Sequence, residues 1–185
     1  MFLSLGVYSQ SIKGVTEEGK KVILNNDGTW KYEVIETKNT VSSDLSDCKY
    51  WTDEVDDFTG KVKKYTKSKY VGKSSTSSGR LTMELRRFDD SYLLVCNYSG
   101  DLGCVSSNSY LMIKLLNGEV VKLMNVGDID CSDMNVFVML SETELNQLLK
   151  SPIEQIRIQG TEYYDDIDKI ELPNYIIDNF KCIKK

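Results

Sequence analysis

The chain of 185 residues contains no histidine, and this absence restricts its chemistry more than any other feature of its composition. Histidine is the usual general base, a member of hydrolase triads and a common ligand of catalytic zinc. Mechanisms that need Ser-His-Asp or Cys-His are therefore excluded. An enzyme with this sequence would have to use carboxylates, lysine, tyrosine or a thiolate.

Long apolar runs and paired cysteine motifs are also missing. No run approaches the roughly 18 apolar residues that span a membrane, and no Cys-x-x-Cys pair supports a structural zinc or redox site. We therefore expect no transmembrane segment, no metal and no cofactor. The 28 acidic residues outnumber the 23 basic ones, and the net charge of -5 disfavours nucleic acid as a partner of the whole molecule.

The first residues have the features that end a signal peptide. Residues 1–9 form a short apolar segment that finishes in small or turn-compatible residues, which is typical of a cleavage site. We therefore interpret them as the remnant of a signal peptide and expect a periplasmic or secreted protein. An ordinary N-terminal β-strand is the alternative interpretation.

Residues 10–35 are expected to contain an N-terminal β-hairpin. Lys21–Leu24 and residues 29–34 read as two strands, and the turn between them includes Gly28. The residues Val22-x-Leu24-x-x-Asp27-Gly28-Thr29-Trp30-x-Tyr32 resemble a short module near the N-terminus of uncharacterised exported bacterial proteins. This resemblance implies export and a hairpin, and it brings no catalytic residue with it.

A polar segment rich in Ser and Thr, residues 36–47, predicts a linker to a main domain at residues 48–185. Alternating apolar residues then predict several strands, and the continuously apolar residues 92–96 predict a central strand buried on both faces. Two helices are expected late in the chain, after Ser141 and from Pro173. The predicted class is α+β with a mostly antiparallel sheet.

Cysteine spacing predicts a disulfide between Cys104 and Cys131. If Asn117-Gly118 is a two-residue hairpin loop, opposed residues have numbers that sum to 235, and this pair has that sum. Opposed residues in antiparallel strands lie close enough for a disulfide. A bridge from Cys96 to Cys104 is an alternative, and reduced buried cysteines are another.

Acidic residues invite two further interpretations. Residues 128–133 resemble the start of a calcium loop, but Asp133 and Met139 stand where an EF-hand needs glycine and glutamate. Paired carboxylates would suit a glycosidase. Three adjacent pairs are present, and they are Asp56-Asp57, Asp89-Asp90 and Asp165-Asp166. Solvated turns are the simpler interpretation for all of these acids.

One segment concentrates positive charge. It carries six lysines and no acid, with two tyrosines between them, and the residues are Lys61, Lys63, Lys64, Tyr65, Lys67, Lys69, Tyr70 and Lys73. Lysines that alternate with tyrosines can contact phosphate or sulfate groups while the rings stack on bases or sugars. We take this segment as the candidate binding site, and a solvated strand and loop is the alternative.

Together these features favour a non-catalytic exported binding or accessory module. Its partner would be an envelope component, a polysaccharide or another protein. A carboxylate-dependent glycan hydrolase and an inhibitor or immunity-type protein are the alternatives.

The signal-peptide interpretation predicts that the mature chain begins at Gln10. The intact mass of the protein recovered from its native compartment should therefore lack residues 1–9. A mature chain that keeps these nine residues would contradict the interpretation.

Overall fold

The computed structural model describes residues 12–15, 21–25, 28–32 and 48–184. The chain divides into two compact units, residues 1–44 and 45–185. The expected signal-peptide remnant at residues 1–9 and the expected linker at residues 36–47 lie outside the described residues. In the described ranges, no helix is long and apolar enough to cross a membrane.

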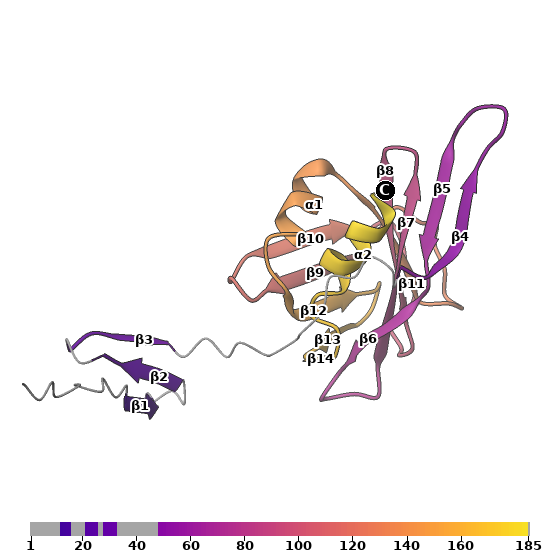
Figure 1. Ribbon diagram of the computed structural model, residues 1–185. Coiled ribbons are helices and arrows are strands. Elements are labelled where there is room, and N and C mark those ends of the chain that lie inside the picture. Colours follow the sequence, from indigo (N-terminus) through magenta and orange to yellow (C-terminus); the bar gives the residue numbers. More distant parts are fainter. Residues whose placement is uncertain (1–11, 16–20, 26–27, 33–47, 185) are drawn as a thin grey trace, which may run out of the picture. The chain divides into compact units, whose positions relative to one another are not determined.

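The first unit contains a small antiparallel sheet (Figure 1). Strand β2 (Lys21–Leu24) pairs with β3 (Trp30–Tyr32), which are the two strands of the predicted hairpin. Strand β1 (Ile12–Val15), which the sequence analysis did not predict, pairs with the other edge of β2. Gly28 has a φ of 82° in the turn before β3. Residues with a side chain rarely adopt this conformation, so the turn depends on the glycine.

The second unit contains two antiparallel sheets (Figure 1). The four-stranded sheet has the order β10-β9-β12-β13, and the seven-stranded sheet has the order β11-β8-β7-β5-β4, with β6 beside β7 and β14 beside β6. The strands are β4 (Tyr50–Val55), β5 (Val62–Thr66), β6 (Lys69–Lys73), β7 (Arg80–Phe88), β8 (Ser91–Tyr98), β9 (Tyr110–Leu115), β10 (Val120–Met124), β11 (Asn135–Leu140), β12 (Ile153–Gln159), β13 (Tyr164–Ile167) and β14 (Lys169–Ile170). The mostly antiparallel α+β class is confirmed.

One apolar core joins the two sheets. Alternate residues of β7, Leu81, Met83 and Leu85, are fully buried, as the two-residue period predicts. They belong to the same buried cluster as Leu111 and Ile113 of β9 and as residues of β12. Strands such as β7 and β9 therefore turn one set of side chains inward and leave the other set on the outer face of their sheet.

The two helices come late in the chain, as expected. Helix α1 (Glu142–Leu148) begins at Ser141, whose hydroxyl accepts a hydrogen bond from the Glu144 amide in the predicted capping box. Helix α2 (Tyr175–Ile183) buries its apolar side, and the Tyr175 hydroxyl donates to the Met83 carbonyl at 2.8 Å. The Arg87 guanidinium donates to carbonyls at the C-terminal end of α2, which need such partners.

The expected disulfide between Cys104 and Cys131 is present, but the register argument behind it was wrong in one step. The loop of the β9–β10 hairpin has three residues rather than two, because the Leu115 amide donates to the Glu119 carbonyl. Opposed residues in these strands therefore sum to 234. The ladder breaks after β10, and the irregular segments beyond it shift the register by one residue, which brings the two cysteines together.

A second disulfide, between Cys48 and Cys182, was not predicted. It joins the start of the described part of the second unit to helix α2, with a sequence separation of 134 residues. Tyr50 lies beside it and donates from its hydroxyl to the Cys182 carbonyl at 2.9 Å. The alternative bridge from Cys96 to Cys104 is excluded, since Cys96 is a buried free thiol in β8. Burial raises the pKa of that thiol far above its ordinary value.

A buried carboxylate, that of Asp165 in β13, connects the two sheets. It accepts hydrogen bonds from Ser74 (2.9 Å), Ser77 (2.5 Å) and Tyr98 (2.5 Å), and from the amide of Asp166. Burial alone would raise the pKa of Asp165, but these four donors together lower it below its ordinary value. The carboxylate is therefore ionised at neutral pH and ties β8 and the loop after β6 to β13.

The same loop depends on close packing around Tyr98. A Cβ atom at Gly79 or at Gly100 would overlap the Tyr98 side chain. The Ser75 amide and hydroxyl also donate to the Asp168 carboxylate, at 2.7 and 2.5 Å. Two carboxylates near β13 therefore fix the loop that leads into β7.

The disulfides and the buried thiol predict a specific pattern of reactivity. Native protein should give no reaction with a maleimide, because Cys96 is buried and the other four cysteines are paired. Denatured, unreduced protein should take up one equivalent. Labelling followed by mass spectrometry measures both numbers, and three or five reactive thiols after denaturation would contradict the pairing.

Asp165→Asn should lower the free energy of unfolding by about 1 to 3 kcal/mol, because it replaces an acceptor of four hydrogen bonds. The contribution of the carboxylate is fully present above the unfolded pKa of about 3.9, and it is lost as the pH falls through the lowered folded pKa. Urea denaturation at pH 7 and near pH 3 should show a large and then a smaller difference from the parent. The control is Asp57→Asn at an exposed site; an equal effect there would refute the role of Asp165.

Candidate functional site

The outward residues of β7 define the candidate site. Thr82, Glu84, Arg86 and Phe88 alternate with the buried residues of this strand and lie on the outer face of the seven-stranded sheet. The pairing register places Asn97, Val95 and Leu93 of β8 beside them, followed by Asn135, Phe137 and Met139 of β11. The expectation that residues 92–96 are buried on both faces was wrong for Leu93, which is only half-buried on this outer face.

A shallow groove of about 300 Å³ crosses this face. It is called the outer groove below, and the residues that line it are Ser68, Thr82, Glu84, Arg86, Val95, Asn97, Asn135 and Phe137. Val95 is 7% exposed and Phe137 is half-buried, so the groove has an apolar part. The volume is at the lower end of the range for ligand sites, about 300 to 1,000 Å³.

Polar groups in the outer groove have spare hydrogen-bonding capacity. The Asn97 amide nitrogen donates to the Asn135 side-chain oxygen at 3.1 Å, which leaves the other oxygen and the other nitrogen of this amide pair available. In the part of the chain that the structure describes, no hydrogen bond reaches the hydroxyl of Ser68 or Thr82. The Arg86 guanidinium donates to Glu84 at 2.7 and 3.4 Å, so the groove contains an ion pair.

An aromatic shelf lies at one end of the outer groove. The Tyr65 and Phe88 rings are 5.2 Å apart, and the Arg86 guanidinium lies 5.1 Å from the centre of the Tyr65 ring. Arg86 therefore connects the shelf to the groove. A planar ligand group could pack on these rings while its polar edge faces Arg86.

Both tyrosines of the predicted binding segment lie on the outer face of the seven-stranded sheet. Tyr65 opposes Arg86, and Tyr70 opposes Thr82, so both tyrosines are in register with residues of the outer groove. Partial burial raises the pKa of Tyr70, and the negative charge of Glu171 adds to that shift. Both tyrosines thus lie beside the groove, although neither lines it.

The predicted lysines do not act as one cluster. Lys63 opposes Phe88 of the shelf, and Lys73 opposes Arg80. Lys67 precedes Ser68 of the groove in the chain, whereas Lys69 after it opposes the buried Met83. Lys61 is exposed in the loop before β5, away from the groove residues. Lys64 faces the other side of the sheet, where it pairs with Asp53 at 3.4 Å and lies over the Tyr50 ring.

The structure gives each of the three acidic pairs of the sequence at least one structural partner. Asp165 points inward to its hydroxyl donors, whereas Asp166 points outward and binds the Arg157 guanidinium at 2.7 Å. Asp56 accepts bonds within its own loop, and Asp89 accepts a bond from the Val62 amide at 2.8 Å. At least one carboxylate of each pair is therefore engaged in the fold.

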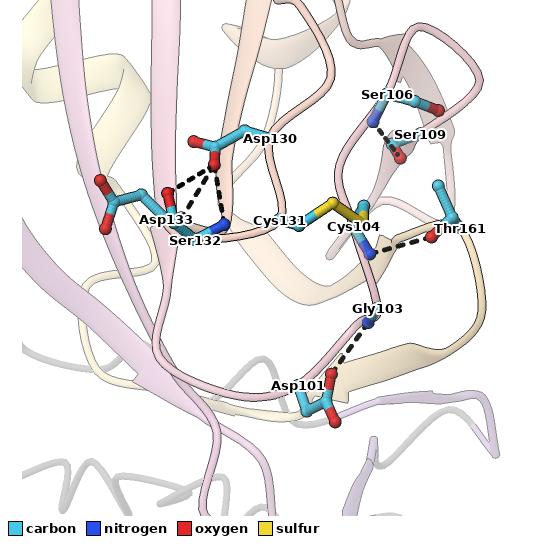
Figure 2. The surroundings of a disulfide bond; sticks show 10 residues. All are labelled: Asp101, Gly103, Cys104, Ser106, Ser109, Asp130, Cys131, Ser132, Asp133 and Thr161. Atoms are coloured by element: carbon cyan, nitrogen blue, oxygen red, sulfur yellow. Dashed lines mark hydrogen bonds between the residues drawn. A yellow bond between two sulfur atoms is a disulfide. The ribbon is translucent and has the colours of Figure 1, made fainter.

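A second depression, of about 470 Å³, lies beside the Cys104–Cys131 disulfide and is lined by residues 97–101 and 132–134. Asp101, which lines it, accepts a bond from the Gly103 amide, and Asp130 in the neighbouring loop accepts bonds from Ser132 and Asp133, as Figure 2 shows. These bonds lower the pKa of Asp130. Among the described residues, no group of three or more acids or cysteines is placed to hold a metal ion.

Sequence analysis missed most of the outer groove. Arg86, Asn97, Asn135 and Phe137 come from three strands, and only the pairing of β7, β8 and β11 brings them together. The alternation in β7 was a usable signal, because it assigned Glu84 and Arg86 to an exposed face. Comparison of the chain with known protein families, with curated proteins and with solved structures found no match.

Proposed function

We propose that this protein is an exported, non-catalytic binding module that holds a saccharide chain in the outer groove. The observation that carries the proposal is the composition of this groove. It combines Phe137 and Val95 with two side-chain amides, two hydroxyls and the Glu84–Arg86 ion pair.

This composition matches the chemistry of a sugar. A sugar ring presents C–H groups that pack against aromatic and aliphatic side chains, and hydroxyl groups that need both donors and acceptors. Phe137 supplies the apolar contact, while Asn97 and Asn135 retain one acceptor and one donor between them. The shape also fits, because a groove on an open sheet face admits a chain that continues beyond the site.

A binding role is favoured over hydrolysis by the state of the carboxylates. Hydrolysis of a glycan needs two carboxyl groups on either side of the scissile bond. Glu84 is the single carboxylate among the groove-lining residues, and it is already paired with Arg86. Export is supported by the two disulfides, which persist in oxidising compartments.

One observation favours a second candidate, an inhibitor-type protein that binds another protein. Phe58 is 99% exposed in the β4–β5 loop, and Trp51 is 76% exposed on β4. The Asp56 carboxylate accepts bonds from the amides of Phe58 and Thr59, which fixes the loop. A preorganised aromatic residue can act as an anchor in a protein interface.

Variants in the outer groove separate the two candidates. Phe137→Ser and Asn135→Ala should each weaken saccharide binding by roughly tenfold, since they remove the apolar contact or a donor. Phe58→Ser, on the hairpin loop, should leave it unchanged. A glycan array identifies the oligosaccharide, and isothermal titration with the parent and the three variants measures the affinities. The proposal is wrong if no glycan binds, or if only Phe58→Ser reduces binding.

A further inference from the structure

Four lysines of β5, of β6 and of the turn between these strands form a positive edge. Lys63, Lys67, Lys69 and Lys73, called the lysine rim below, are exposed, and none of them makes an ion pair with any residue in the described ranges. Lys64 is different, because Asp53 compensates its charge from the opposite side of the sheet. Unpaired cations on neighbouring strands repel one another, so an anionic ligand would relieve this repulsion.

The lysine rim follows one long side of the outer groove. Ser68 lines the groove and stands between Lys67 and Lys69 in the chain. Lys69 opposes the buried Met83, so its position belongs to the other face of the sheet, although its side chain is exposed at the start of β6. Lys63 opposes Phe88 at the aromatic shelf, and Lys73 opposes Arg80 near the other end of β7. The rim therefore runs from the shelf past the groove.

Nearby acids do not cancel this charge. Glu54 opposes Lys63 across β4 and β5, the charge of Lys63 also acts on Asp56, and Glu171 lies near Tyr70. Glu84 in the groove is neutralised by Arg86. Three acids thus face four lysines and Arg80. Without the four lysines of the rim, the chain has 19 basic and 28 acidic residues, so the rim is a local concentration of positive charge on an acidic protein.

We infer that the saccharide is acidic, with its rings in the outer groove and its carboxylate or sulfate groups against the lysine rim. This inference rests on the proposed function. The apolar and amide groups of the outer groove contact the sugar rings, and the lysines bind the acidic substituents. A neutral glycan would use the groove but leave the rim without a counter-charge.

The arrangement is less suited to other polyanions. A nucleic acid carries charge on every unit and would extend from the rim over the strongly acidic remainder of the surface. An anionic membrane is flat and would meet that remainder as well. An acidic glycan places its charges on one edge and keeps hydroxyl groups for the amides of Asn97 and Asn135.

The test compares glycans that differ in charge alone. Polygalacturonate and alginate are each titrated against the full chain beside their esterified, uncharged forms, at low and near-physiological salt. A single-stranded oligonucleotide and phosphatidylglycerol vesicles serve as the other polyanions. Binding to an acidic glycan should exceed binding to its ester. Lys67→Gln with Lys73→Gln should weaken it roughly fivefold or more, and should flatten its salt dependence.

The control is Lys122→Gln with Lys150→Gln, which makes the same change in net charge on exposed lysines outside the rim. It should bind like the parent. Equal binding of acidic and esterified glycan would overturn the inference and leave the proposed function in place. Binding of no glycan would overturn both, and binding of the oligonucleotide or vesicles alone would also overturn both. An equal loss of binding in the control variant would mean that net charge alone explains the effect, and it would refute a specific role of the lysine rim.

Discussion

The two-residue period of β7 is the constraint on which the rest of the second unit depends. Leu81, Met83 and Leu85 fill the core, while the residues between them form the middle of the outer groove. The strand has nine residues and pairs with β8 along its length and with β5 and β6 on its other edge. A register slip of one residue would exchange the two faces, and this would destroy the core and the groove together.

Covalent and polar links fix this register from both ends of the chain. Cys48–Cys182 joins the region before β4 to helix α2, which packs under β5 and β7. Asp165 joins β13 of the other sheet to Tyr98 at the end of β8. A groove made of side chains from three strands needs such links, because an affinity of the proposed kind depends on groups that do not reorganise when a ligand binds.

Sequence reasoning recovered most of the fold because its signals are local. The alternation in β7 and β9, the capping box at Ser141 and the late helices all depend on residues close in the chain. Features that depend on pairing between residues far apart in the chain were not predicted. No pattern in the sequence indicates that Cys182 pairs with Cys48, and the two-residue loop assumed for the β9–β10 hairpin has three residues in the structure.

Only part of the candidate site could be predicted from the sequence, for the same reason. Composition identified the 61–73 segment, but treating it as one cluster ignored the alternation of β5, which sends Lys63 and Tyr65 to one face and Lys64 to the other. Strands β5 and β6 and the turn between them therefore supply a rim to the groove, and most of the groove itself comes from β7, β8 and β11. Because rim and groove come from different strands, charge and shape can be changed separately, and a salt-screened part of the affinity can be told apart from an unscreened part.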